Sequence, residues 1–115
     1  MPKTPEKINL KKYMGTWKQI SVKPVPWFQK GCKNVRANYK LRTDGKVDVL
    51  NICDDREKRG VARSVSDNNK ELEVSFFPFI WGEYNIVELD GTYKNVTLKG
   101  GKYTWKLKKC RTRKC

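Results

Sequence analysis

The sequence of 115 residues contains no histidine, and this absence excludes several kinds of site. Ser-His-Asp and Cys-His catalytic arrangements need an imidazole as the base, and many zinc sites use one as a ligand. The sequence also has no apolar run close to the ~18 residues that a membrane-spanning helix needs. We therefore expect neither a histidine-dependent enzyme nor an integral membrane protein.

The four cysteines, Cys32, Cys53, Cys110 and Cys115, include no close Cys-x-x-Cys pair. Zinc ribbons and thiol redox motifs need such a pair, so we expect no metal site and no cofactor. Disulfides can form in an oxidising compartment, and four cysteines allow three pairings. The first residues lead into a charged stretch, which indicates no signal peptide. We expect a periplasmic or secreted protein if a signal has been removed, and a cytoplasmic one otherwise.

Apolar and polar residues alternate along most of the chain, which is typical of β-strands with one buried face. The dipeptides at 44–45, 90–91 and 100–101 are Asp-Gly, Asp-Gly and Gly-Gly, which favour tight turns. Only residues 5–12 are compatible with a helical turn. The predicted strands cover residues 16–22, 35–42, 46–53, 60–65, 71–77, 83–89, 93–99 and 102–109.

Eight antiparallel strands in sequence order predict an all-β fold, a closed up-and-down barrel, because closure removes the exposed edges of the sheet. We expect a single domain over residues 1–115, with the barrel at about 13–109 and a basic, cysteine-containing tail at 110–115. The interior of an eight-stranded barrel holds either packed side chains or one small ligand.

Residues in the inward phase of these strands are the candidates for lining a pocket. Several are aromatic and would crowd a small solid core, which favours a cavity. Asn51 shares the apolar phase, so it is either a buried polar residue with a partner or a polar handle in a pocket. The candidate ligand-binding residues are Val35, Ala37, Tyr39, Val49, Asn51, Leu72, Val74, Phe76, Tyr84, Ile86 and Trp105.

An ordered set of segments resembles the lipocalins, and in particular the bacterial lipocalins related to apolipoprotein D. The segments are residues 13–17 (YMGTW, with the Gly-x-Trp opening), 27–32 (WFQKGC), 37–39 (ANY), 44–51 (DGKVDVLN), 74–79 (VSFFPF), 81–86 (WGEYNI), 88–90 (ELD) and 103–107 (YTWKL). The resemblance implies a calyx, a barrel that binds a small lipophilic molecule such as a fatty acid or a lysophospholipid. It implies a carrier or scavenger. We expect no enzyme, because a cysteine nucleophile would lack its usual histidine base and no inward-facing carboxylate pair is evident.

The resemblance also assigns structural roles. Gly15 and Trp17 would lie at the closed end of the barrel, where a cation from the last strand stacks on the Trp17 ring. The family normally uses arginine there, and this sequence has Lys109. Lipocalins usually carry a helix after the eighth strand, for which this sequence leaves no room, so it reads as a minimal form. The wall left uncovered could then mediate self-association.

Relatives of apolipoprotein D tie a cysteine at the position of Cys32 to one in the C-terminal tail. The resemblance therefore implies a disulfide from Cys32 to Cys110 or Cys115. A direct bond between Cys32 and Cys53 fits the predicted hairpin poorly, because a turn at residues 44–45 places Arg36 opposite Cys53.

The chain carries 26 Lys and Arg against 12 Asp and Glu, a formal net charge of +14. Such charge can be an ordinary solvated exterior, or it can attract an anionic membrane, a nucleic acid or an acidic protein. We expect no specific nucleic-acid readout, because the strand aromatics fall in the inward phase. The alternative to a lipid carrier is a non-enzymatic interaction or structural module whose basic exterior docks on an acidic partner.

Overall fold

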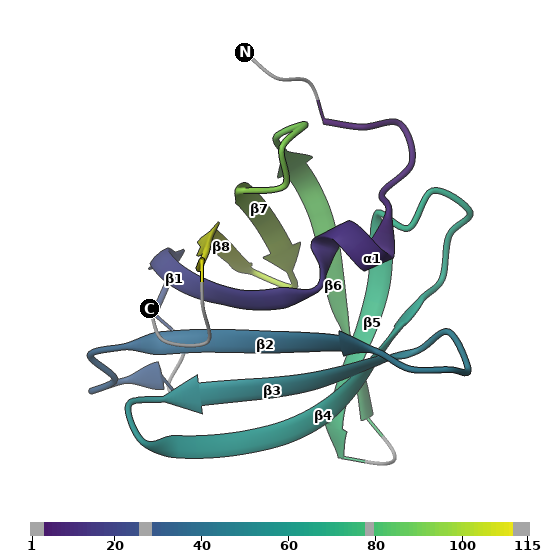
Figure 1. Ribbon diagram of the computed structural model, residues 1–115. Helices are drawn as coiled ribbons and strands as arrows, with labels where there is room; N and C mark the ends of the chain where they lie inside the picture. Colours follow the sequence, from purple (N-terminus) through teal and green to yellow (C-terminus); the bar gives the residue numbers. More distant parts are fainter. Residues whose placement is uncertain (1–3, 26–28, 78–79, 112–115) are drawn as a thin grey trace.

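Eight antiparallel strands form a closed barrel in which each strand pairs with the next and β8 pairs with β1 (Figure 1). The computed structural model describes residues 4–25, 29–77 and 80–111. The barrel confirms the predicted all-β, up-and-down fold. Its elements are α1 (Leu10–Tyr13), β1 (Gly15–Lys23), β2 (Val35–Leu41), β3 (Val47–Cys53), β4 (Arg56–Ser64), β5 (Glu71–Phe77), β6 (Ile80–Leu89), β7 (Asn95–Gly100) and β8 (Tyr103–Lys109).

Two strands begin three or more residues earlier than predicted. β4 starts at Arg56 rather than Gly60, and β6 starts at Ile80 rather than Glu83. The first residues of β4 are four consecutive charged residues, so they show no alternation, yet they pair with the last four residues of β3. Tertiary pairing has overridden local composition here, as it commonly does in strands. β7 starts later than predicted, at Asn95, because Tyr93 has a positive φ and belongs to the preceding turn.

That turn is organised by Asp90, whose carboxylate accepts hydrogen bonds from Thr92, from the Lys94 backbone N–H and from the Asn95 amide. Partial burial acts to raise the pKa of Asp90, but these hydrogen bonds outweigh it and lower the pKa to about 2. The charged carboxylate therefore fixes the β6–β7 connection at neutral pH.

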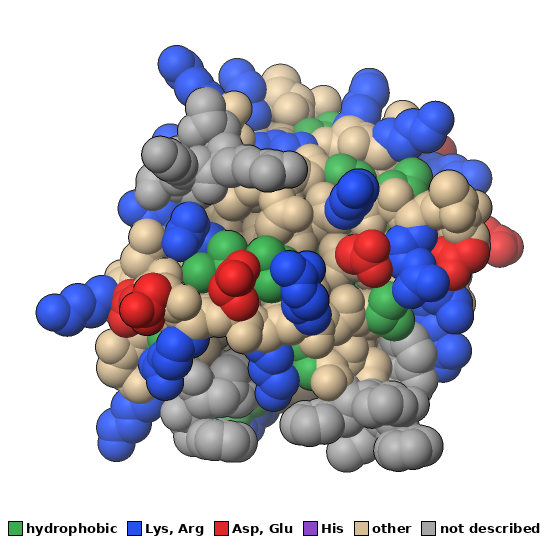
Figure 2. Space-filling view, turned by 60° about the horizontal axis from the view of Figure 1, so that its bottom comes forward, with side chains coloured by type: hydrophobic (Ala, Val, Ile, Leu, Met, Phe, Trp, Pro, Cys, Tyr) green, Lys and Arg blue, Asp and Glu red, His purple; other side chains and the backbone are tan. Residues whose placement is uncertain are grey.

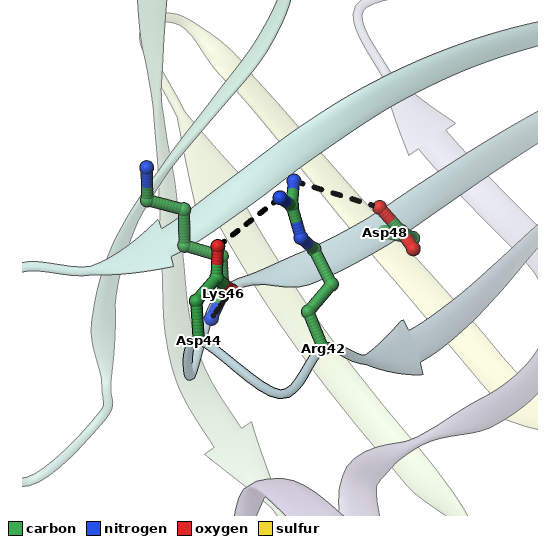
Figure 3. A network of polar contacts seen from close by, with 4 residues as sticks. All are labelled: Arg42, Asp44, Lys46 and Asp48. Carbon is green, nitrogen blue, oxygen red and sulfur yellow. Dashed lines mark hydrogen bonds and ion pairs between the residues drawn. The ribbon is translucent and has the colours of Figure 1, made fainter.

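The β2–β3 hairpin closes through a five-residue loop, residues 42–46. The Arg42 N–H donates to the Lys46 carbonyl, and Gly45 has a φ of +88°. The Arg42 guanidinium lies 3.1 Å from Asp44 and 3.9 Å from Asp48, and Asp44 also accepts from the Lys46 N–H (Figure 3). These exposed ion pairs contribute little to stability, so we read the network as a hairpin feature rather than a site.

Because the loop has five residues, the register of β2 against β3 differs by one position from the register predicted with a two-residue turn. This difference affects which cysteine can reach Cys53. Val35, rather than Arg36, lies opposite Cys53. The Asp54 carboxylate accepts from the backbone N–H groups of Lys33 and Asn34, which holds the segment before β2 beside the end of β3.

Cys32 is consequently bonded to Cys53, with the two Cα atoms 5.5 Å apart. The expected bond from Cys32 to Cys110 or Cys115 is therefore wrong. Cys110 is also disulfide-bonded, and Cys115 lies outside the described residues. The Cys32–Cys53 bond joins the β1–β2 connection to the last residue of β3, at the end of the barrel opposite α1 (Figure 1).

Candidate functional site

One end of the barrel is closed by α1 and the segment before it (Figure 1). The Ile8 N–H donates to the Asn68 carbonyl, and the Asn9 N–H donates to the Tyr93 hydroxyl, which ties this segment to two loops at that end. Ile8 and Trp17 are completely buried. The Asn9 side chain caps α1 by accepting from the backbone N–H groups of Lys11 and Lys12. The closed end is thus a packed apolar plug.

Trp17 is the centre of this plug. Its Nε1 donates to the Tyr13 carbonyl at 2.9 Å, and the Lys109 ammonium lies 5.2 Å from the centre of its ring system. Lys109 also donates to the Lys12 carbonyl, and partial burial lowers the pKa of Lys109. A Cβ on Gly15 would lie 3.2 Å from Lys109 Cε, and Gly15 has a φ of +119°. The positive φ and the close lysine explain why glycine precedes the tryptophan by two residues.

Three tyrosine hydroxyls form a chain inside the barrel, directly above this plug. Tyr84 donates to Tyr39 at 2.9 Å, and the hydroxyls of Tyr13 and Tyr84 are 2.5 Å apart. Burial is the main cause that raises the pKa of each phenol, to about 12 for Tyr39 and well above 10.0 for Tyr13 and Tyr84. Tyr13 was missed by sequence reasoning, because it precedes the first strand and takes part in no alternating pattern.

We expect this tyrosine chain to make the protein unstable in alkali. Between pH 10 and about pH 12 the unfolded chain loses phenolic protons that the folded protein keeps, so the free energy of unfolding falls as pH rises. Urea unfolding across this range measures the slope. Tyr39→Phe removes one of the three protons and should make the slope shallower, whereas Tyr103→Phe, outside the chain, should not. An identical slope in both variants would contradict the assignment.

A small cavity lies at the same level of the barrel. Its volume is about 10 Å³, room for roughly one water molecule. Its lining residues are Leu10, Tyr13, Met14, Tyr39, Val47, Ala62, Leu72 and Tyr84. The floor of the barrel is therefore well packed.

The fully buried inward-facing residues lie mostly in the half of the barrel nearer the closed end, although Met14, Leu41 and Tyr84 in that half are only partly buried. The predicted pocket residues divide accordingly. Those nearer the closed end are buried: Ala37, Tyr39, Val49, Leu72 and Ile86. The remaining ones are partly exposed: Val35, Asn51, Val74, Phe76, Tyr84 and Trp105. The described interior is thus solid at one end and partly accessible at the other.

Aromatic side chains line the accessible half. Phe76 lies over Gly60, where a Cβ would approach its ring to 2.6 Å, so glycine makes room for the ring. On the other side, Trp105 packs beside Gly100, and its ring centre is 5.6 Å from that of Tyr103. These rings offer a large apolar surface for a ligand.

Lys58 adds a positive charge to this half. It pairs across the sheet with Asn51, which places both residues on the inner face, and its ammonium lies 5.5 Å from the centre of the Phe76 ring. Sequence reasoning missed Lys58, because it belongs to the charged start of β4 that was not predicted as strand. The accessible half therefore combines apolar rings with an amide and an ammonium group.

Comparison with known proteins decides the family. The family model described as a lipocalin-like domain matches residues 8–112. The chain belongs to the lipocalin family. The resemblance seen in the sequence is thus confirmed, and the structural features above are those of a lipocalin barrel.

Relatives of this lipocalin come from viruses, bacteria and animals. It is 32% identical over 111 residues to a putative lipocalin of Acanthamoeba polyphaga mimivirus, covering 84% of this chain and 63% of the relative. It is 35% identical to the outer membrane lipoprotein Blc of Citrobacter freundii, covering 89% and 62%. With mouse apolipoprotein D it shares 32% identity, covering 69% and 44%. The chain spans less than two thirds of the length of these curated relatives.

A solved structure shares the fold at low sequence identity. The cockroach allergen Per a 4 superposes with a TM-score of 0.63 at 13% identity, covering 94% of this chain and 73% of the other. Within the described part of this lipocalin, no helix is long and apolar enough to cross a membrane. No three His, Cys, Asp or Glu side chains of the described residues gather into a group that could hold a metal ion.

Proposed function

We propose that this lipocalin binds one small lipophilic molecule, of the fatty acid or lysophospholipid class, inside its barrel. The unequal burial along the inner face carries the proposal. Apolar residues such as Val35, Phe76 and Trp105 face the interior but are only partly buried. A folded barrel that needed only a solid core would bury such side chains at both ends. Their partial exposure at one end supports a binding site that opens there.

The ligand enters, in this proposal, by the end that bears the Cys32–Cys53 bond, and its apolar chain points toward the tyrosines. The packed floor at Tyr13, Tyr39 and Tyr84 sets the depth it reaches. Lys58 and Asn51 lie on the inner face near the entrance, where they suit an anionic headgroup. Apolar contact supplies most of the affinity, and the few polar groups give orientation.

Trp105→Ala tests the apolar part of the site. Loss of roughly 60 Å² of apolar contact, at about 25 cal/mol per Å², should weaken binding of a fluorescent fatty acid by about tenfold. Val87→Ala is the matched control, because Val87 is 44% exposed and lies outside the inner face. Circular dichroism and thermal unfolding show whether each variant remains folded. Unchanged affinity in a folded Trp105→Ala protein would contradict the proposed site.

A variant of Lys58 distinguishes the contribution of the ligand's charged headgroup from that of its apolar chain. Lys58→Gln should weaken binding of a fatty acid by about two- to fivefold, the range of an exposed ion pair, and leave the matching fatty alcohol unaffected. Equal losses for both ligands would show that Lys58 does not contact a charged headgroup.

A further inference from the structure

The charges of the barrel are divided unequally between its two sides. β7, β8, β1 and β2 are consecutive in the closed barrel, and the structure describes every residue in them. These four strands contain no Asp or Glu. We call their outer surface the basic wall. Its outward-facing cations are Lys18, Lys23, Arg36, Lys40, Lys99, Lys106 and Lys108.

The other four strands have a different composition. β3 to β6 contain six acidic residues, against four basic ones. Figure 2 brings the lower side of Figure 1 forward, and there Asp and Glu side chains lie among Lys and Arg. The excess positive charge of the strands is therefore confined to the basic wall, and it is not spread evenly over the exterior.

Within the basic wall, cations stand directly opposite one another. Lys18 of β1 pairs with Lys108 on one side and with Arg36 on the other. Like charges in directly opposed positions repel and destabilise a sheet. The three ion pairs between described residues lie elsewhere, in the β2–β3 hairpin and between β4 and β5. A row of cations held this close without carboxylates favours an external anionic partner.

Exposed apolar residues in β1 and just beyond its end indicate which anionic partner fits. Ile20 is 61% exposed in the outer face of β1, and Val25, two residues beyond its end, is 63% exposed. Aliphatic side chains among lysines suit the boundary between phospholipid headgroups and acyl chains. The outward positions of these four strands carry no aromatic residue on which nucleic-acid bases could stack.

We propose that the basic wall docks this lipocalin onto a bilayer surface that contains anionic phospholipids. Figure 1 shows β7, β8 and β1 side by side, so the cations form one continuous surface. The molecule measures 36 × 35 × 28 Å, several times the Debye length of about 10 Å at moderate salt. Cations on the far side are therefore screened from a membrane that touches the basic wall. The docking does not depend on a ligand in the barrel.

The test compares two variants of equal net charge. One is Lys18→Gln, Lys106→Gln, Lys108→Gln on the basic wall, and the other is Lys11→Gln, Lys46→Gln, Arg59→Gln on exposed positions elsewhere. Co-sedimentation is measured with phosphatidylcholine vesicles with and without phosphatidylglycerol. The native protein should bind only the anionic vesicles, and less at high salt. The basic-wall variant should lose about a hundredfold in partitioning, the control at most about threefold.

Three outcomes would overturn the proposal. Equal losses in the two variants would show that only total charge matters. If the native protein did not bind anionic vesicles, an anionic membrane would be excluded as the partner of the basic wall. If duplex DNA binding depends on the three wall lysines while vesicle binding does not, the basic wall serves a nucleic acid instead. Thermal unfolding of both variants verifies that each is folded.

Discussion

Replacing Trp17 with alanine should lower the free energy of unfolding by about 3–5 kcal/mol. Trp17 is fully buried, and its indole N–H donates a hydrogen bond to the Tyr13 carbonyl. The Lys109 ammonium lies over the Trp17 ring in a cation–π contact. The change would therefore leave a large cavity, an unpaired carbonyl and a partly buried charge without its ring. Urea-induced unfolding followed by circular dichroism measures the loss.

Two further variants separate the contributions at Trp17. Trp17→Phe keeps most of the ring volume and loses the N–H, so it should cost less than the alanine variant. Lys109→Gln removes the charge and should cost about 0.5–2 kcal/mol, the range of a cation–π contact. If Trp17→Ala cost no more than Lys109→Gln, the plug would not be the main support of the closed end.

Removal of the Cys32–Cys53 bond should cost about 3 kcal/mol of stability. The two cysteines are separated by 21 positions, and the entropy of closing a loop of that length in the unfolded chain gives roughly this value. Cys32→Ala combined with Cys53→Ala is preferable to chemical reduction, because Cys110 is also in a disulfide that a reductant would break. Urea unfolding of the native and double-variant proteins gives the difference.

The position of this bond predicts a second effect of the double variant, on ligand binding. It lies at the open end of the barrel, where the proposed ligand enters, and the Asp54 hydrogen bonds hold the same segment. The double variant should therefore lose ligand affinity as well as stability, while the packed closed end keeps its fold. A double variant with native stability would show that the bond does not constrain the unfolded chain.

The barrel could be predicted from the sequence because its signals are local. Alternation along β2 and β5 and the Asp-Gly and Gly-Gly turns depend only on neighbouring residues. The start of β4 could not be predicted, because Arg56 to Arg59 show no alternation and become strand only by pairing with β3. That error also concealed Lys58, the cation on the inner face.

Other features depend on how distant strands meet. The hydroxyls of Tyr13, Tyr39 and Tyr84 meet only after the barrel closes, since they come from α1, β2 and β6. The disulfide was predicted incorrectly because the resemblance implied a tail cysteine and because Cys32 lies before β2, in a segment that the Asp54 hydrogen bonds hold beside the end of β3. The five-residue β2–β3 loop also moves the register by one position. The unequal division of charge likewise emerges only once β7 and β8 lie beside β1 and β2.

Methyl NMR during titration with a long-chain fatty acid tests the central claim, that the ligand lies inside the barrel, most directly. The methyl signals of the inward-facing Val35, Ala37 and Val74 should shift, and the shifts should saturate at one ligand per protein. The same methyl groups should show intermolecular contacts to the acyl chain. The methyl signals of the outward-facing Ile20 and Val87, which are 61% and 44% exposed, should not shift. Shifts confined to the outward methyls, with the inward ones unchanged at saturation, would contradict the account and place the lipid on the exterior.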